Sequence, residues 1–348
     1  MIPSSPVVRA RVPLRLGLAG GGTDLSPYCD EHGGAVLNVT IDRYAYAFIE
    51  PSADGMVHFL APDVGLEECF APDLDSIAGA RLRLHAGVLR RMALQYGGGR
   101  VPPLRITSFV DAPAGSGLGS SSALVVALVE AFRFHLGLPL GRYDVAHMAF
   151  EIERLELKLA GGKQDQYAAC FGGANFIEFL ADHRVIVNPL RVPVAILNEL
   201  ETATVICFTG VSRRSEAIIE DQQRRMSGPD KQLDDLHQLK ADALEMKEAL
   251  LRGEIDRMAA VLNRSWAAKK RTAAGISTEG IETLYACGQA AGAMGGKVSG
   301  AGGGGFMMFL VPPPRRMQLI QALNGAGGTA SGVHFTSEGA EAWSAAGY

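Results

Sequence analysis

The chain has 348 residues, of which 47% are hydrophobic, and carries a formal net charge of −4 with a pI near 6.1. This length suits two domains of ordinary size or one large one, and the apolar content excludes a disordered chain. We expect no general nucleic-acid binding surface, because such proteins carry a basic face. These numbers leave room for a local basic pocket.

Glycine is the enriched residue, with 42 of 348 positions against a typical ~7%. Its clustering indicates backbone that comes close to a ligand or adopts positive φ. The five cysteines are an odd number and include no CxxC pair, so we expect reduced thiols and neither a disulfide framework nor a zinc site.

The N-terminal 17 residues contain no long apolar stretch of the kind found in signal peptides. No apolar run reaches the ~18–20 residues that a membrane span needs. We therefore expect a cytoplasmic protein without a membrane partner, and the sequence leaves the oligomeric state open.

Strands are predicted for segments rich in β-branched and aromatic residues, and helices for segments with apolar residues three to four positions apart. In chain order, the expected strands lie at 7–18, 34–50, 104–110, 203–208 and 306–311, and the expected helices at 77–96, 123–136, 143–159, 231–251 and 255–269. Strands and helices mix without regular alternation, and no repeat of solenoid length occurs. We predict an α+β fold in two domains, residues 1–193 and 194–348.

The strongest functional signal is the segment from Pro113 to Leu128, where a glycine-rich loop follows a strand and opens a helix with three consecutive serines. The first N–H groups of a helix lack intrahelical partners and carry the positive end of its dipole. Glycines let the backbone wrap an anion, and serine hydroxyls can bond it or face a metal. An ordinary N-cap needs only one serine, so the pattern favours phosphate binding. The residues assigned to this role are Gly115, Ser116, Gly117, Leu118, Gly119, Ser120, Ser121 and Ser122.

Two better-known nucleotide motifs are excluded. The nearest match to GxxxxGK[ST], at residues 291–298, lacks both the first glycine and the final hydroxyl. A GxGxxG at Gly300, Gly302 and Gly305 precedes a predicted strand, whereas the dinucleotide fingerprint follows a strand and opens a helix. Four consecutive glycines still indicate close approach to a ligand, and we assign Gly302 and Gly303 to the nucleotide site.

Three motifs, in this order, resemble those of the GHMP kinases, the family of galactokinase, homoserine kinase, mevalonate kinase and phosphomevalonate kinase. They are PLRLGLAGGGTD at 13–24, PAGSGLGSSSA at 113–123 and KVSGAGGGG at 297–305. The resemblance implies a two-domain GHMP kinase fold with the active site in the cleft between the domains. It also implies ATP as the phosphoryl donor and Mg²⁺ as the metal.

The resemblance assigns the catalytic residues. Asp165, in what we expect to be a loop after a helix, lies in a segment similar to the catalytic-aspartate stretch of galactokinases. This implies that Asp165 accepts or orients the proton of the attacking hydroxyl. Arg15 matches the basic residue of the first motif, which implies that it holds Asp165 and offsets charge during phosphoryl transfer.

Glu153 lies on a largely apolar face of the helix predicted at 143–159. A carboxylate there is costly unless it is paired or bound to a metal, whereas Glu151 is expected to pair with Arg154 on the polar face. The family's magnesium glutamate lies a short distance before its catalytic aspartate. The resemblance therefore implies Glu153 as one Mg²⁺ ligand and Ser121 as the second.

The end of the first motif is the expected sugar site. Asp24 aligns with the family's acceptor of a sugar hydroxyl, and Gly21, Gly22 and Thr23 are assigned to the substrate with it. Galactokinases carry Glu-His where this chain has Gly21-Gly22, which argues against galactose. Longer stretches, at 19–46, 160–179 and 209–222, resemble the heptose-phosphate kinase branch of the family. This implies transfer to the anomeric hydroxyl of D-glycero-D-manno-heptose 7-phosphate.

Two alternatives stay open: an L-fucose kinase, which shares a similar GG-x-TD motif, and a non-catalytic sugar or nucleotide sensor on the same fold. Retention of all the predicted catalytic and metal residues argues against the sensor. For a distal substrate phosphate, the candidates are the basic pairs Arg213-Arg214 and Lys269-Lys270. Arg213 is preferred, because arginine at a helix start combines guanidinium and backbone donors. The adenine pocket is expected among apolar residues at 60–110.

Overall fold

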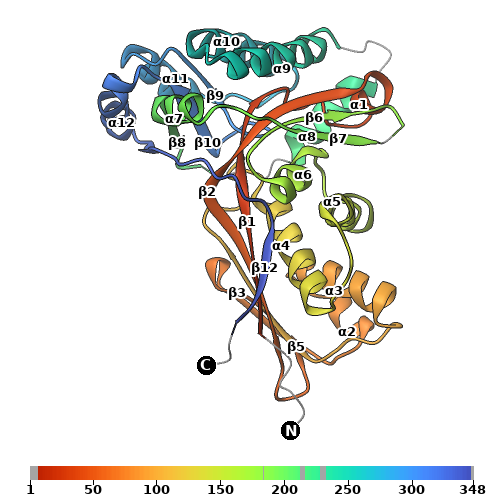
Figure 1. Cartoon of the computed structure of the whole chain (residues 1–348). Coiled ribbons are helices and arrows are strands. Elements are labelled where there is room, and N and C mark those ends of the chain that lie inside the picture. The colour runs from red at the N-terminus through yellow and green to blue at the C-terminus, as the bar shows by residue number, and fades with distance from the viewer. Residues whose placement is uncertain (1–6, 183, 212–215, 228–232, 346–348) are drawn as a thin grey trace.

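The computed structural model describes residues 7–182, 184–211, 216–227 and 233–345. Its larger sheet is built on two long strands, β1 (Val7–Ala19) and β2 (Gly34–Pro51), which pair antiparallel and run from the lower end of the molecule into the upper body (Figure 1). The sheet order is β12-β1-β2-β5-β3-β4, and β6 and β7 extend it from the far end of β2. These further strands are β3 (Val57–Ala61), β4 (Leu66–Phe70), β5 (Leu104–Val110), β6 (Ala174–Phe179), β7 (Val185–Pro189) and β12 (Glu341–Ala345).

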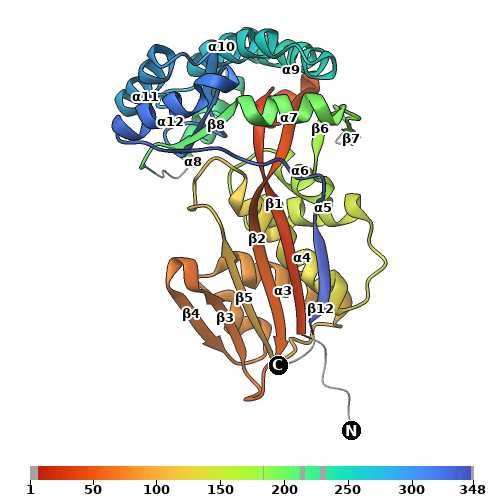
Figure 2. The same ribbon diagram turned by 60° about the vertical axis from the view of Figure 1, so that its left-hand side comes forward.

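Helices cover one face of this sheet, and Figure 2 shows α3 and α4 behind its strands. The central helix is α4 (Ser120–His135), which has 11 buried residues out of 16 and packs against β1 and β2. Around it lie α2 (Leu74–Ala78), α3 (Arg83–Tyr96), α5 (Arg142–Phe150), a π-helical turn (Glu151–Glu156) and α6 (Gln164–Phe171). Because α4 is apolar on nearly every side, it can only be stable in the middle of such a layer.

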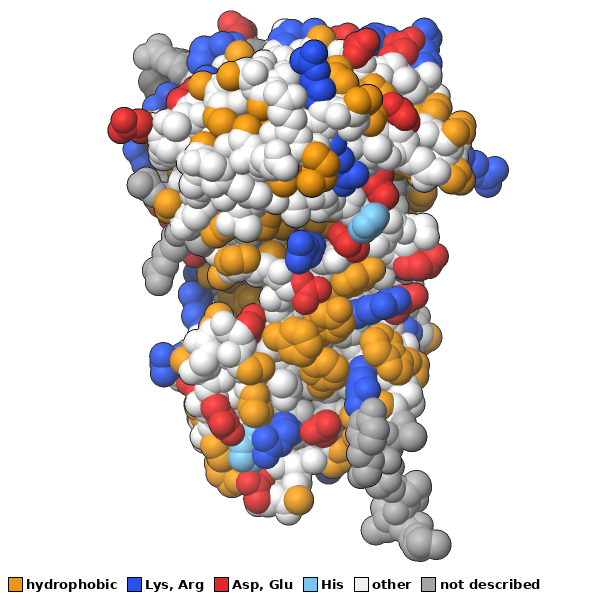
Figure 3. All heavy atoms as spheres, turned by 90° about the vertical axis from the view of Figure 1, so that its left-hand side faces the viewer, with side chains coloured by type: hydrophobic (Ala, Val, Ile, Leu, Met, Phe, Trp, Pro, Cys, Tyr) orange, Lys and Arg blue, Asp and Glu red, His pale blue; other side chains and the backbone are white. Residues whose placement is uncertain are grey.

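The uncovered face of the sheet carries a row of half-buried aromatic side chains from β2 and β5. The rings of Tyr46, Phe48 and Phe109 stack with centroids 4.7–6.5 Å apart. Figure 3 views the molecule from this side and shows hydrophobic side chains gathered over the strands. The contacts of Tyr46 and Phe48 with Phe109 are cross-strand pairs, which stabilise a sheet on a face without helices.

The upper body contains a second, antiparallel sheet of order β11-β8-β10-β9. Its strands are β8 (Thr204–Phe208), β9 (Gly295–Val298), β10 (Phe306–Leu310) and β11 (Thr329–Ser331). The surrounding helices are α1 (Tyr28–His32), α7 (Val194–Ala203), α8 (Glu216–Ser227), α9 (Asp234–Arg252), α10 (Ile255–Arg271), α11 (Glu279–Ala290) and α12 (Arg316–Gly325). Helix α9 packs against α10 and also contacts β1 and β2. It therefore joins the two bodies of the molecule: the lower body, built on the larger sheet, and the upper body, built on the smaller sheet.

The predicted α+β fold is confirmed, and β5 has the predicted bounds. Two predicted helices are corrected: the segment 77–96 is divided between α2 and α3, and the segment 143–159 ends as a π-helical turn. The division at residue 193 stays a prediction. The C-terminal strand β12 nevertheless pairs antiparallel with β1, so residues from both predicted domains share the larger sheet.

No helix in the described ranges is both long enough and apolar enough to span a bilayer.

Candidate active site

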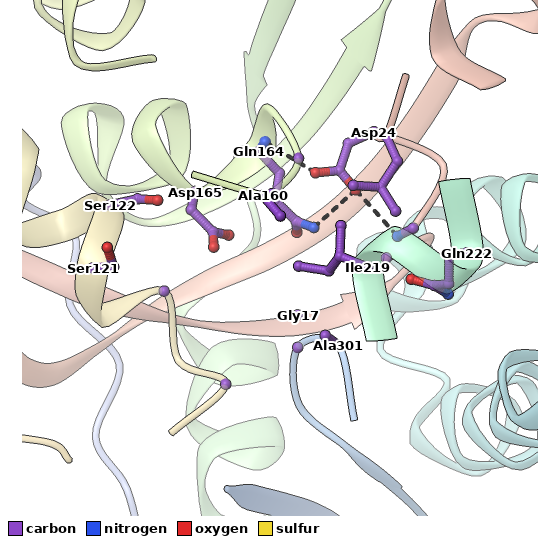
Figure 4. Close-up of a pocket in the computed structure, with 18 of the residues that line it drawn as sticks. Gly17, Asp24, Ser121, Ser122, Ala160, Gln164, Asp165, Ile219, Gln222 and Ala301 are labelled. Carbon is purple, nitrogen blue, oxygen red and sulfur yellow. Dashed lines mark hydrogen bonds between the residues drawn. The ribbon is translucent and has the colours of Figure 1, made fainter. Parts of the chain in front are cut away.

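A cavity of about 640 Å³ lies between the two bodies. It is lined by β1 and the glycine turn after it, the loop before α4, the start of α6, and residues of α8, α10 and the third glycine motif. Figure 4 shows side chains from both halves of the chain facing this space. The predicted motifs are thus brought together, as an inter-domain site requires.

The loop before α4 forms one wall of the cavity. Gly119 is the N-cap of α4 in the left-handed conformation. The loop residues that line the cavity are Gly115, Gly117, Gly119, Ser120, Ser121 and Ser122, whereas Ser116 and Leu118 lie buried behind it. The start of α4 therefore faces the cavity with the backbone N–H groups of its first turn, which is the arrangement that binds phosphate.

The third glycine motif packs directly against this loop. Gly117 has φ +78°, and a Cβ there would lie 2.2 Å from the carbonyl oxygen of Ser299. The Ser299 hydroxyl donates to the Gly117 carbonyl at 2.8 Å. Gly302 and Gly303, which we assigned to the nucleotide, do not line the cavity, and the Gly303 N–H instead donates to a backbone carbonyl at 2.8 Å. The residues of this motif that line the cavity are Lys297, Val298, Gly300 and Ala301.

Arg15 and Asp165 form an ion pair at the centre of the site. The Nε and Nη2 atoms of Arg15 each lie 2.7 Å from Asp165 Oδ1, and Nη1 donates to the Gly117 carbonyl at 2.6 Å. Arg15 is almost fully buried, while the Asp165 side chain retains 20% exposure to the cavity. Asp165 lies in the first turn of α6 and not in a loop, which corrects the sequence prediction.

Glu153 is fully buried beside the loop serines. Its Oε1 accepts from the Ser121 hydroxyl at 2.8 Å, and its Oε2 accepts from the Ser122 hydroxyl and the Gln166 amide, each at 2.7 Å. Arg154 Nη1 lies 3.2 Å from Glu153 Oε1. The carboxylate is thus held rigidly at the edge of the cavity, which Ser121 and Glu153 both line.

The expected Glu151–Arg154 pair is not formed. Glu151 instead contacts Arg91 at 2.8 Å. The guanidinium of Arg154 turns inward, toward Glu153 and the carbonyls of Leu159, Ala160 and Gly162. The π-helical turn that starts at Glu151 changes the faces on which these side chains lie, so the pair predicted from α-helical spacing was wrong.

The end of the first motif forms the opposite wall. Asp24 is buried and accepts hydrogen bonds from the Gly22 N–H at 3.1 Å and from the Gln164 amide and N–H at 3.1 and 3.2 Å (Figure 4). Gly21, Gly22 and Asp24 line the cavity. Thr23 does not: its hydroxyl is used by the backbone of Gly20 and Ala35.

The sequence analysis did not predict that three further residues would line the cavity together: Gln222, Lys269 and Lys297. Lys269 had been noted only as half of a basic pair, and Lys297 only as the first letter of a glycine motif. Their chain positions, on α8, α10 and β9, carry no local signal that would place them together. Arg213, the preferred phosphate residue, lies outside the described residues.

Comparison with known families and structures agrees with this geometry. The model for the N-terminal domain of GHMP kinases matches residues 83–173, and the model for their C-terminal domain matches residues 246–329. D-glycero-alpha-D-manno-heptose 7-phosphate kinase of Campylobacter jejuni is 42% identical over 339 residues, which covers 97% of this chain and 98% of that protein. The chain belongs to the GHMP kinase family. The motifs at 113–123 and 297–305 lie within the matched ranges.

Solved GHMP kinase structures have the same fold. A D-glycero-D-manno-heptose 1-phosphate kinase from Bacteroides thetaiotaomicron superposes with a TM-score of 0.84 at 39% identity, over 98% of this chain and 100% of that one. Lactococcus lactis galactokinase, solved with galactose, gives a TM-score of 0.73 at 20% identity, over 96% and 95% of the two chains. At that identity the galactokinase supports the fold alone.

We expect Gly117→Ala to weaken ATP binding by at least about tenfold and to lower the melting temperature. The new Cβ would collide with the Ser299 carbonyl, and the left-handed backbone adds roughly 1–2 kcal/mol of strain. Gly98→Ala is the matched control, because Gly98 also has positive φ but has no heavy atom within 4 Å of the added Cβ. Thermal unfolding and nucleotide titration test this. Equal behaviour of the two variants would show that the Gly117–Ser299 contact is dispensable.

Proposed function

We propose that this GHMP kinase is an ATP-dependent sugar kinase that transfers the γ-phosphoryl group to the anomeric hydroxyl of D-glycero-D-manno-heptose 7-phosphate. The observation that carries the proposal is the Asp165 carboxylate, fixed by Arg15 and exposed to a cavity whose wall is the phosphate loop. The identity of 42% over 97% of the chain with a heptose 7-phosphate kinase supports this acceptor. We also propose that the protein acts in the cytoplasm, as expected from the sequence, because ATP is the phosphoryl donor.

Asp165 is suited to orient the attacking hydroxyl and take its proton. Arg15 occupies Oδ1, which leaves Oδ2 to accept a hydrogen bond from the acceptor. A Cβ on Gly119 would lie 3.3 Å from this Oδ2, so the free oxygen faces the start of α4, where the transferred phosphate would lie. Phosphoryl transfer depends mainly on such positioning and on fixed charge.

The residues at Glu153 fit the Mg²⁺ that the family resemblance implies. Ser121 Oγ and Glu153 Oε1 are 2.8 Å apart at the edge of the cavity, and these two oxygens would hold the ion. No cluster of three or more His, Cys, Asp or Glu suited to a metal occurs within the described part of the chain. This suits Mg²⁺, which takes one or two protein oxygens and completes its shell with phosphates and water. The bound ion would neutralise charge on the nucleotide phosphates.

We expect Asp165→Asn to retain ATP binding and to lower kcat by about 10²–10⁴-fold, because general-base assistance is worth that much. Asp75→Asn is the control, since Asp75 is likewise the second residue of a helix but is exposed and outside the cavity. Steady-state turnover with folding checked by circular dichroism measures both. A kcat for Asp165→Asn within a few-fold of wild type would remove Asp165 from the mechanism.

We expect Glu153→Gln to raise the Mg²⁺ concentration that gives half-maximal activity, because an amide is a weaker ligand than a carboxylate for a hard cation. Glu151→Gln serves as the control, because Glu151 is occupied by Arg91 and does not line the cavity. Mg²⁺ titrations of turnover at fixed ATP compare the two. Identical curves for Glu153→Gln and wild type would exclude Glu153 as a ligand.

The acceptor is tested with a panel of D-glycero-D-manno-heptose 7-phosphate, the corresponding 1-phosphate, L-fucose and D-galactose. We expect the highest kcat/KM for the 7-phosphate, whose anomeric hydroxyl is free to react. The 1-phosphate controls for this hydroxyl, and it also tests the acceptor named for the Bacteroides relative. Preference for L-fucose would favour the fucose kinase alternative, and no ADP release with any sugar would favour the sensor.

A further inference from the structure

Two ammonium groups lie along the short backbone segment that ends β1. Lys269 Nζ, from the last turn of α10, donates to the Gly21 carbonyl at 3.2 Å. Lys297 Nζ, from β9, lies 3.4 Å from the Leu18 carbonyl. Both side chains line the cavity, so one helix and one strand deliver two positive charges to one wall.

Neither ammonium has a carboxylate within 4.0 Å among the described residues. Burial lowers the pKa of Lys269 to about 8, although Asp24 partly opposes this shift. Burial also lowers the pKa of Lys297 to about 7, and the neighbouring charges of Lys269 and Arg15 lower it further. Both side chains are half-buried. Removing a cation from water is costly when no carboxylate is in direct contact with it, and a bound anion would lower that cost.

The neighbouring side chains are arranged for a phosphorylated polyol. Gln222 is 1% exposed; its Nε2 donates to Thr272 at 2.6 Å, while its Oε1 is a buried acceptor without a hydrogen-bond partner. A Cβ on Gly22 would lie 2.9 Å from Lys269 Nζ, so a larger residue there would displace the ammonium. Gly17 has no heavy atom within 4 Å of an added Cβ, which leaves room beside β1 for a sugar chain.

This part of the cavity is separate from the phosphate-loop end. In Figure 4, Ser121 and Gln222 lie on opposite sides, with Asp165 between them. A Cβ on Gly22 would approach both Lys269 Nζ and Gln222 Nε2, so Lys269 lies at the Gln222 end. An acceptor that places its reacting hydroxyl at Asp165 would therefore extend its other end toward Gln222 and Lys269, and Lys297 is close enough to Lys269 for their charges to interact. The nucleotide phosphates have their own donors at the start of α4.

We infer that Lys269 and Lys297 bind the acceptor's own phosphate group, at the end of the sugar opposite the anomeric hydroxyl. This inference rests on the proposed function and names the part of the site that recognises a phosphorylated substrate. Lys270, the other half of the basic pair noted in the sequence, has a different role: its Nζ contacts Glu282 at 3.0 Å and does not line the cavity.

The test compares D-glycero-D-manno-heptose 7-phosphate with unphosphorylated D-glycero-D-manno-heptose in the full-length enzyme. Lys269→Met and Lys297→Met should each raise KM for the 7-phosphate about 10- to 100-fold, as expected for loss of one charge-assisted hydrogen bond. The KM for the free sugar and the KM for ATP should change little. Lys270→Met, the matched control, should behave as wild type with both acceptors.

A second readout does not need turnover. The 7-phosphate should raise the melting temperature of the wild type and of Lys270→Met, but raise it much less in Lys269→Met and Lys297→Met. Unchanged KM and unchanged thermal shift in both lysine variants would overturn the inference. A loss of kcat that is equal for the two acceptors would also overturn it, because it would assign the lysines to the transferred phosphoryl group.

Failure of the proposed function gives a different result. A wild-type enzyme that phosphorylates no sugar phosphate, and is not stabilised by any, would overturn both the proposed function and the phosphate site. A wild type that accepts the 7-phosphate while the lysine variants keep its KM would overturn the phosphate site alone.

Discussion

The guanidinium of Arg15 fixes the separate parts of the site relative to one another. It bonds Asp165 on α6 through two nitrogens and the Gly117 carbonyl of the phosphate loop through the third. The Ser299 hydroxyl donates to the same carbonyl, so the upper body is tied to the same point. Because the guanidinium is planar and its donors are rigidly spaced, the loop, α6 and β1 cannot shift independently. The long pairing of β1 with β2 holds this anchor in place.

The charges around this anchor are unevenly distributed. The charged side chains that line the cavity within the described residues are Arg15, Arg83, Arg154, Lys269 and Lys297 against Asp24, Glu153, Asp165 and Glu216. Arg15 and Arg154 each have a carboxylate partner, whereas Asp24 is satisfied by neutral donors. The chain as a whole carries −4, yet the cavity offers two ammonium groups, of Lys269 and Lys297, that contact backbone carbonyls. Such a local field attracts anionic ligands into a protein with an acidic surface balance.

The sequence allowed prediction of those features that depend on local pattern. The strand–loop–helix of the phosphate site and the bounds of β5 follow from glycine, serine and β-branched residues in a short window. Features set by tertiary contact were not predicted: the π-helical turn that turns Arg154 toward Glu153, and the pairing of β12 with β1. The position of Lys269 in the cavity was not predicted for the same reason. Nothing in Lys269-Lys270 indicates which side chain faces the cavity, because the packing of α10 decides it.

The two cavity lysines also bear on the stability of the free protein. An ordinary lysine has a pKa of 10.5, whereas burial lowers the pKa of Lys269 to about 8 and that of Lys297 to about 7. Between these values the unfolded chain binds more protons than the folded one, so folding stability rises with pH across that window. Below it, the full cost of two buried charges falls on the folded state. A neutral sugar leaves this cost in place, because its hydroxyls supply no counter-charge. A phosphate dianion removes it by keeping both ammonium groups protonated and paired, so the stored cost itself favours a phosphorylated acceptor over a free sugar.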